Sequence, residues 1–319
     1  MKKIILVSTG GTISMMKKGE RGIVPTIRGE ELLEMIPFES QLVEFEVCEF
    51  SNIPSPWMTP RKMLELANKI KSLSSICDGL VITHGTDTLE ETAYFLSLIL
   101  KPDCPVVMTA AMRAPPDLGL DGPRNLYDSI QVVLSEQAAG RGVMVVMNNE
   151  IFSPREVMKI STTSVTGFTA PNYGCWGTVD LKVMFYHQPS PQSPLEIEDV
   201  NARVELVKAT AGSDSRIILG LLEQPVDGLV IEALGRGNVP PGMLEGIEQA
   251  VSKIPVVITT RVLQGRVAPV YGYSGGGKTL AEMGCYFAED LSGPKARIKL
   301  IILLSAGKLH ELGRYFTRL

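Results

Sequence analysis

Short apolar runs alternate with segments of helical periodicity along the first 150 residues of the chain. These runs and segments follow one another at residues 4–9, 30–36, 43–50, 61–73, 79–86, 88–100, 105–111, 125–139 and 142–148. Hydrophobicity in the strand-like runs is continuous, as in a parallel sheet that is covered on both faces. The pattern predicts an α/β fold whose ligands bind beyond the carboxyl ends of the strands.

A proline-rich segment at residues 187–201 interrupts both periodicities, as a connecting segment does. Strand and helix patterns resume after it, at residues 216–222, 228–234, 243–254, 255–262, 279–285 and 296–305. A length of 319 residues also favours two unequal domains. We therefore predict a larger N-terminal α/β domain with a parallel-rich sheet (1–190), a linker (191–209) and a smaller C-terminal α/β domain (210–319).

Composition narrows the class of partner. The chain is 45% hydrophobic and 21% charged, with a net charge of -4, and no apolar run approaches the length of a membrane helix. Nothing resembles a basic stripe for a phosphate backbone. We therefore expect a soluble protein that binds a small molecule and neither nucleic acid nor a membrane.

The cysteines indicate the compartment. Five cysteines are widely spaced without a CxxC pair, which argues against a disulfide framework and against a zinc site. Reduced thiols in the cytoplasm fit this pattern best. Only three histidines are present, so a Ser/His/Asp triad has few candidates, and His84 alone lies in a motif-like setting.

Two threonine-bearing turns carry the candidate chemistry. The first apolar run leads into Gly10-Gly11-Thr12, where paired glycines allow a sharp turn and a close approach of substrate. Another leads into Gly85-Thr86-Asp87. Taken singly, Thr86 and Asp87 are better explained by capping of the helix that follows. Together, two turns at the carboxyl ends of parallel strands are expected to meet in one pocket.

A hydroxyl that attacks an amide needs a base. A lysine that burial keeps neutral is suited to that task, and Lys159 lies among apolar and hydroxyl residues. By spacing alone, a surface lysine is the better explanation of the position.

At the level of whole motifs, the sequence resembles the bacterial-type asparaginase and glutaminase family. The resemblance lies in STGGTI at 8–13, THGTDTLEETAYF at 83–95, AAMR at 110–113, DGPRNL at 121–126, GRGN at 235–238 and PKAR at 294–297. These segments appear in the family's order and span nearly the whole chain.

The resemblance implies a homotetramer, or at least a dimer, in which subunits share active sites. It also implies deamidation of a small amide in two steps, with threonine attack followed by hydrolysis of the acyl-enzyme, and without a metal or an organic cofactor. Thr12 would be the nucleophile, and Thr86 with Lys159 a second centre. Asp87 would bind an ammonium group and Ser55 a carboxylate. Main-chain groups of Gly11, Gly85 and Ala111 would orient the reacting amide.

Three positions depart from the family pattern. Ile23 lies where relatives carry a catalytic tyrosine. The glycines and charges of the lid-like stretch at 17–26 fit a lid and an ordinary surface loop equally. The neighbouring subunit's glutamate is absent from 271–278, where Tyr271 and Tyr273 flank glycines; both tyrosines, and Asn238, are candidates for a contribution from a neighbouring subunit. Trp57 follows Ser55 where relatives of the periplasmic type have polar side chains, and an apolar wall of the site or a core or interface residue explains it equally.

These departures remove polar ligands for an amino acid while the threonine motifs remain. The leading hypothesis is hydrolysis of L-asparagine to L-aspartate and ammonia. One alternative is an amidohydrolase or lactamase that acts on an amide without a typical α-amino group. The other is a non-catalytic amino-acid sensor.

Overall fold

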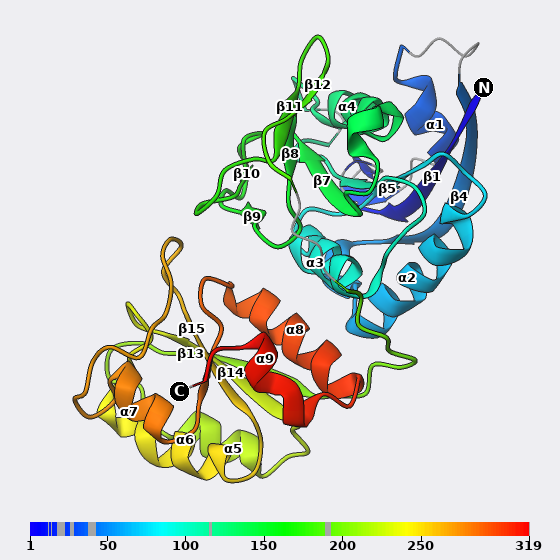
Figure 1. Cartoon of the computed structure of the whole chain (residues 1–319). Helices are drawn as coiled ribbons and strands as arrows, with labels where there is room; N and C mark the ends of the chain where they lie inside the picture. The colour runs from blue at the N-terminus through cyan, green and yellow to red at the C-terminus, as the bar shows by residue number, and fades with distance from the viewer. Residues whose placement is uncertain are drawn as a thin grey trace. The chain divides into compact units, whose positions relative to one another are not determined.

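The chain divides into two units, Met1–Pro194 and Leu195–Leu319 (Figure 1). The structure is a computed structural model that describes residues 1–11, 13, 15–17, 23–25, 29–37, 43–114, 117–188 and 193–318. For 15–17 and 23–25 it describes the backbone alone.

The first unit is built on an eight-stranded sheet with the order β12-β11-β8-β7-β6-β5-β1-β4. Five neighbouring strands are parallel: β4 (Val43–Ile53), β1 (Lys2–Gly10), β5 (Gly79–Thr83), β6 (Val106–Thr109) and β7 (Val143–Met147). Three short strands extend it antiparallel: β8 (Glu150–Phe152), β11 (Gly177–Val179) and β12 (Val183–Phe185). The parallel part follows the predicted apolar runs, and β5, β6 and β7 are buried throughout.

Helices cover both faces of this sheet. On one face, α1 (Gly29–Glu34) and α4 (Gly122–Leu134) join a core with alternate residues of the strands, such as Leu6 and Val81. The other face carries α2 (Pro60–Ser74) and α3 (Leu89–Ile99), which pack against each other (Figure 1). Burial on both sides explains why the central strands read as continuous apolar runs.

Short elements complete the first unit. They are the hairpins β2 (Met15–Lys17) with β3 (Ile23–Pro25) and β9 (Met158–Lys159) with β10 (Phe168–Thr169), and the 3-10 turns η3 (Ser55–Trp57) and η4 (Glu136–Ala138). The lid-like stretch at 17–26 lies partly in the first hairpin, and residues 18–22 and 26 fall outside the described residues.

The second unit holds a parallel four-stranded sheet with the order β13-β14-β15-β16. Its strands are β13 (Val204–Lys208), β14 (Gly228–Ala233), β15 (Val256–Thr260) and β16 (Tyr286–Phe287). Its helical elements are α5 (Arg216–Leu222), η5 (Pro241–Met243), α6 (Leu244–Val251), α7 (Gly277–Glu282), α8 (Gly293–Ser305), η6 (Leu309–Glu311) and α9 (Leu312–Tyr315). The buried side of α8 packs against β13, β14 and β15.

The predicted fold class is confirmed: both units are α/β, and the first has the larger, parallel-rich sheet. The predicted linker, 191–209, includes β13, so residues 204–208 form an edge strand of the second unit's sheet. Residues 189–192 lie outside the described ones.

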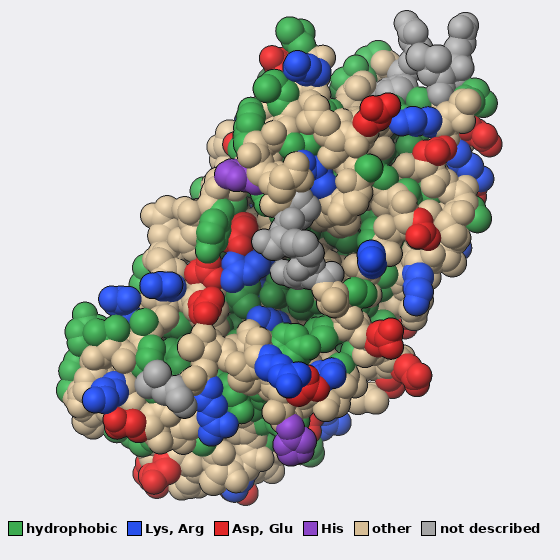
Figure 2. All heavy atoms as spheres, in the orientation of Figure 1, with side chains coloured by type: hydrophobic (Ala, Val, Ile, Leu, Met, Phe, Trp, Pro, Cys, Tyr) green, Lys and Arg blue, Asp and Glu red, His purple; other side chains and the backbone are tan. Residues whose placement is uncertain are grey.

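The length of the helices and the distribution of surface charge are the features on which binding to a membrane or a nucleic acid would depend. Within the described parts of the chain, no helix is both long and apolar enough to cross a membrane. Figure 2 shows positive and negative side chains interspersed on the face in view, in keeping with a net charge of -4.

Candidate functional site

The two predicted turns follow neighbouring strands. β1 pairs with β5 in parallel up to Ser8 and Thr83, so the chain leaves both strands at the same edge of the sheet. Gly11 has a φ of +84°, and a Cβ there would lie 2.3 Å from the main-chain nitrogen of Gly85. The turns therefore touch through backbone atoms, which only glycine at position 11 permits.

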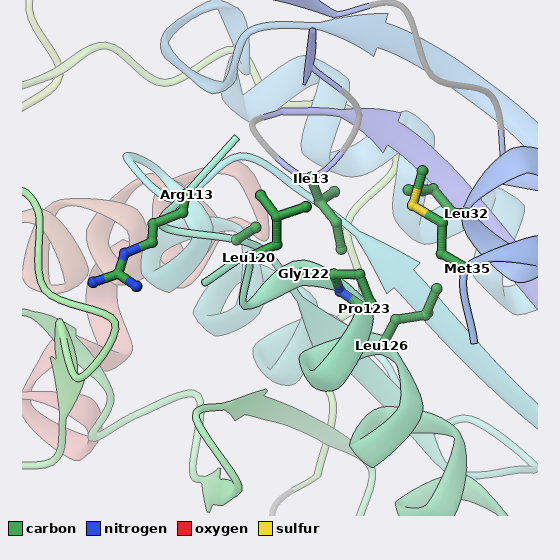
Figure 3. Close-up of a pocket in the computed structure, with 9 residues that line it drawn as sticks. Ile13, Leu32, Met35, Arg113, Leu120, Gly122, Pro123 and Leu126 are labelled. Atoms are coloured by element: carbon green, nitrogen blue, oxygen red, sulfur yellow. The ribbon is translucent and has the colours of Figure 1, made fainter. Parts of the chain in front are cut away.

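Thr12 itself lies outside the described residues, but both of its neighbours are buried. Ile13 is 4% exposed, and its side chain lines an apolar pocket beside the turn (Figure 3). The other lining residues are Leu32, Met35, Ala111, Arg113, Leu120, Gly122, Pro123 and Leu126. Gly11 on one side and Ile13 on the other thus hold the ends of this turn in the protein interior.

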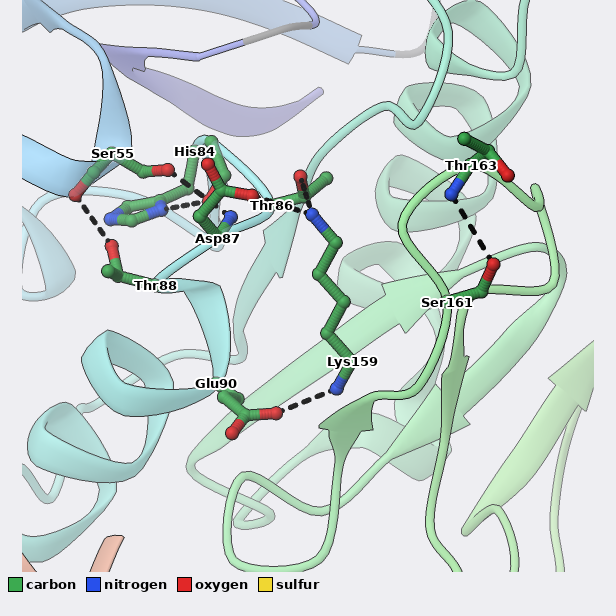
Figure 4. Close-up of polar contacts among 10 residues, drawn as sticks. Ser55, His84, Thr86, Asp87, Thr88, Glu90, Lys159, Ser161 and Thr163 are labelled. Carbon is green, nitrogen blue, oxygen red and sulfur yellow. Dashed lines mark hydrogen bonds and ion pairs between the residues drawn. The ribbon is translucent and has the colours of Figure 1, made fainter. Parts of the chain in front are cut away.

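The second turn brings three chemically different groups together. Lys159 Nζ donates a hydrogen bond to Thr86 Oγ1 at 2.8 Å and forms an ion pair with Asp87 Oδ1 at 2.6 Å (Figure 4). Thr86 is buried, whereas the Asp87 side chain is 58% exposed. A hydroxyl, an amine and a carboxylate that reaches solvent therefore meet at one point.

Lys159 is held from both ends. It lies on β9, where it pairs with Phe168 of β10, and its main-chain N–H donates to Glu90 Oε2 at 2.7 Å (Figure 4). Its side chain is only 19% exposed, so the interpretation as a surface lysine is wrong. Its Nζ is not enclosed by apolar groups alone, because the carboxylate of Asp87 contacts it.

Ser55 lies against the same turn from η3. Its Oγ accepts a hydrogen bond from the Asp87 N–H at 3.2 Å, and its carbonyl accepts one from Thr88 Oγ1 at 2.8 Å. A Cβ on Gly85 would lie 2.6 Å from Ser55 Oγ, so Ser55 is in direct contact with the turn. Trp57, two residues later, is 65% exposed.

Ala111 is buried just beyond the end of β6, the next strand along the sheet. The turn that follows it is fixed by Asp121, whose carboxylate accepts from the N–H groups of Met112 and Arg113, both at 2.9 Å. Asn125 binds the Ala110 carbonyl and Asp121 at once. Asp121 and Asn125 of the DGPRNL segment therefore fix the main chain of this turn through hydrogen bonds.

The capping interpretation of the THGTDT segment is not supported. α3 begins at Leu89 with Thr88 at its N-cap, and the Thr88 side chain makes no capping hydrogen bond. Asp87 instead binds Lys159, and the Thr88 hydroxyl binds Ser55. The side chains of Asp87 and Thr88 therefore contact the residues of the site.

His84 is a residue for which the sequence indicated a motif but no role. It is completely buried, and its ring nitrogens contact Gly85 O at 2.8 Å and Thr92 Oγ1 at 3.1 Å. Burial lowers the pKa of His84 from 6.5 to about 4. The sequence signal that could have pointed to His84 is its position directly before Gly85-Thr86-Asp87.

The other predicted residues lie in the second unit. Asn238 accepts a hydrogen bond from the Gly277 N–H at 3.1 Å. Tyr271 and Tyr273 are 42% and 55% exposed, with ring centroids 5.7 Å apart. Their contribution to a neighbouring subunit's site stays a prediction. In the described residues of either unit, no group of three or more His, Cys, Asp or Glu is placed to hold a metal ion.

Comparison with known proteins gives a consistent assignment. Residues 3–191 match the family model "Asparaginase, N-terminal", and residues 203–316 match "Glutaminase/Asparaginase C-terminal domain". The chain is 40% identical to a probable L-asparaginase of Deinococcus radiodurans, over 100% of this chain and 98% of the relative. It is 36% identical to an L-asparaginase of Bacillus licheniformis, over 96% and 97% of the two chains.

A solved structure agrees. The crystal structure of a probable cytoplasmic L-asparaginase from Campylobacter jejuni superposes with a TM-score of 0.88 at 32% identity and 100% coverage of both chains. Family models, full-length relatives and a solved structure thus agree with the two-domain α/β fold. The chain belongs to the asparaginase family and is an L-asparaginase-like amidohydrolase.

Proposed function

We propose that this protein hydrolyses the side-chain amide of L-asparagine to L-aspartate and ammonia. The observation that carries the proposal is the contact of Lys159 Nζ with both Thr86 Oγ1 and Asp87 Oδ1. Such a cluster supplies a nucleophilic or proton-carrying hydroxyl, its base, and an anion for a substrate ammonium group. The full-length relatives that are named L-asparaginase support the choice of substrate.

The reaction that we propose passes through a threonine ester. The Thr12 hydroxyl attacks the amide carbon, the C–N bond breaks, and the nitrogen leaves as ammonia after taking up a proton. Water then attacks the ester and regenerates the hydroxyl. Thr86 and Lys159 form the proton-carrying centre, because their 2.8 Å contact is within the range for direct proton transfer.

Substrate recognition follows from the same groups. Asp87 pairs with the α-ammonium and Ser55 binds the α-carboxylate, while main-chain groups of Gly11, Gly85 and Ala111 orient the amide. An ammonium bound at Asp87 competes with Lys159 for the same carboxylate. Substrate binding would then leave the Thr86 hydroxyl as the remaining polar partner of Nζ at this turn.

A substrate panel tests the assignment. Ammonia release is measured with L-asparagine, L-glutamine and succinamate, which is asparagine without its α-amino group. We expect L-asparagine to be turned over with the highest kcat/KM, because succinamate offers nothing to the Asp87 carboxylate. Turnover of succinamate without turnover of either amino acid would replace the asparaginase with another amidohydrolase.

The acyl-enzyme has its own test. Hydroxylamine competes with water for an ester, so aspartyl hydroxamate should form in proportion to its concentration while asparagine is consumed. Absence of the hydroxamate at undiminished ammonia release would contradict the threonine ester. Steady calorimetric binding of asparagine without ammonia release would indicate a sensor instead of an enzyme.

We also propose a homotetramer or dimer with shared active sites in the cytoplasm. The similar structure from Campylobacter jejuni, named a probable cytoplasmic L-asparaginase, and five free cysteines support this compartment. Mixing inactive Thr86→Val subunits with Tyr273→Phe subunits should restore part of the activity if a site draws on both chains. No recovery after confirmed subunit exchange would contradict sharing through Tyr273.

A further inference from the structure

His84 takes no part in the reaction steps above, yet it directly precedes the Gly85-Thr86 turn and contacts the Gly85 carbonyl. Its side chain is 0% exposed, between the end of β5 and the first half of α3. Both ring nitrogens are engaged, one with the carbonyl of Gly85 and the other with the hydroxyl of Thr92. Thr92 is also fully buried.

The partners determine where the ring proton resides. A carbonyl oxygen can only accept, so the Nδ1 that lies 2.8 Å from Gly85 O carries the hydrogen. The neutral ring has one N–H, which leaves Nε2 as an acceptor for the Thr92 hydroxyl at 3.1 Å. Burial keeps the pKa of His84 at about 4, so the ring stays neutral near pH 7.

The Gly85 carbonyl is linked to Thr86 through a peptide plane. In a trans peptide unit, the C=O of one residue and the N–H of the next point in opposite directions. Because His84 holds the Gly85 carbonyl from the buried side, the Thr86 N–H is turned the other way. Among the residues that the structure describes, the Thr86 N–H has no hydrogen-bond acceptor.

We propose that His84 is a positioning residue that holds the Thr86 N–H ready to donate to the substrate's amide oxygen as negative charge develops on it. Thr92 fixes the imidazole, the imidazole fixes the Gly85 carbonyl, and the peptide plane transmits this orientation to the Thr86 N–H. The inference rests on the proposed function, because it assigns the donor to the same amide hydrolysis.

Four variants test the proposal through kcat and KM for L-asparagine. His84→Leu removes the hydrogen bond to Gly85, so kcat should fall about 10²-fold with KM within about threefold, as for loss of an oxyanion donor. His84→Asn keeps a side-chain N–H near the position of Nδ1 and should recover about tenfold of that loss. Thr92→Val loosens the ring and should lower kcat by about three- to tenfold.

The matched control is Thr83→Val. Thr83 is as deeply buried as Thr92, and its hydroxyl has no hydrogen-bond partner among the described residues, so removing it should leave kcat unchanged. Equal kcat in Thr92→Val and Thr83→Val, or no gain of His84→Asn over His84→Leu, would overturn the proposal. If the His84 variants fail to fold, the two threonine variants decide the question.

Nitrogen NMR separates this inference from the proposed function. In the wild-type protein the His84 ring proton should be on Nδ1, and Thr92→Val should shift the Thr86 amide resonance while Thr83→Val should not. A proton on Nε2 would overturn the inference even in an active asparaginase. If the wild type does not hydrolyse asparagine, the proposed substrate falls alone, and the same kinetic comparison applies to the amide that is hydrolysed.

Discussion

The two ends of strands β5 and β6 carry different chemistry. At the carboxyl end of β5, His84, Thr86 and Asp87 are bonded to groups from α3 and β9. Before the amino ends of the same strands, Cys77 and Cys104 bring their sulfur atoms to 3.7 Å. One pair of parallel strands therefore positions reactive polar groups at one edge and a thiol pair at the other. Changes at the first edge should affect turnover, and changes at the second should affect stability.

The largest effect is expected from Thr86→Val. Valine keeps the shape of threonine but removes the hydroxyl that Lys159 contacts, so kcat for L-asparagine should fall by about 10²–10⁴-fold. The melting temperature should change little. Thr163→Val is the control. Thr163 is exposed in the loop between β9 and β10, so this variant should retain full activity. A kcat of Thr86→Val near that of the control would remove Thr86 from the mechanism.

The next largest effect is expected on stability, from oxidation of the Cys77 and Cys104 thiols. The Cys104 thiol, which hydrogen-bonds to Cys77, lowers the pKa of Cys77, so the Cys77 thiolate is the group that attacks an oxidant. With hydrogen peroxide, Cys77 becomes a sulfenic acid and releases water. Cys104 then displaces a second water to form the disulfide. Closing this loop should stabilise the folded state by about 3 kcal/mol.

The measurement is intact mass and melting temperature before and after peroxide treatment. We expect a loss of two hydrogens, a peptide linked between positions 77 and 104, a higher melting temperature and unchanged turnover. Cys104→Ser should show none of the gain, and Cys48→Ser should behave as wild type. Two free thiols after treatment would contradict this prediction.

The pH dependence of stability tests the buried His84 at the carboxyl end of β5. His84 has its pKa lowered from 6.5 to about 4 in the folded protein, so between these values the unfolded chain binds a proton that the folded chain does not. The free energy of unfolding should be fully maintained above pH 6.5 and fall by up to about 3 kcal/mol as pH drops to 4. Chemical denaturation at pH 7 and 4.5 measures this.

The comparison variant is His84→Asn, which has no group that titrates in this range. Its free energy of unfolding should depend less steeply on pH than that of the wild type. Parallel pH profiles of the two proteins would show that His84 has no depressed pKa.

The smallest effect is expected in α2, the helix that lies in the sequence between Ser55 at the carboxyl edge and Cys77 at the amino edge. α2 begins shortly after Ser55, near the reactive edge, and ends shortly before Cys77. Its N-cap, Thr59, accepts a hydrogen bond from the Lys62 N–H at 3.3 Å, so Thr59→Ala should cost about 1 kcal/mol. Thr59→Ser keeps the hydroxyl and should restore most of that loss. A drop in turnover beyond about twofold in Thr59→Ala would show that the ends are coupled.

The parallel part of the fold was predictable because residues 80–82, 105–108 and 143–147 are apolar throughout, which is what burial of both strand faces requires. The antiparallel strands β8, β11 and β12 were not predicted. Each has only three residues, too few to show a period. Strand β13 was assigned to the linker, because the prolines before it dominated the local pattern.

The candidate site shows a similar division. The meeting of the two turns followed from parallel strand ends, and the register of Ser8 with Thr83 confirms it. Lys159 was a candidate from its setting among apolar and hydroxyl residues, and the resemblance gave it a role. Its pairing with Thr86 could not be read from spacing, because the two residues lie 73 positions apart. His84 had no predicted role since burial and ring partners depend on tertiary packing. Thr12 lies outside the described residues, so its role remains a proposal.

The contact between Gly11 and Gly85 has a consequence for the evolution and redesign of the enzyme. Any side chain at either position collides with the opposite turn or with Ser55, so neither residue can be used to reshape the cavity. Variation in substrate range must therefore arise at peripheral positions. Trp57, which is 65% exposed near Ser55, is the first place where a library of substitutions can alter selectivity without separating the two hydroxyl-bearing turns.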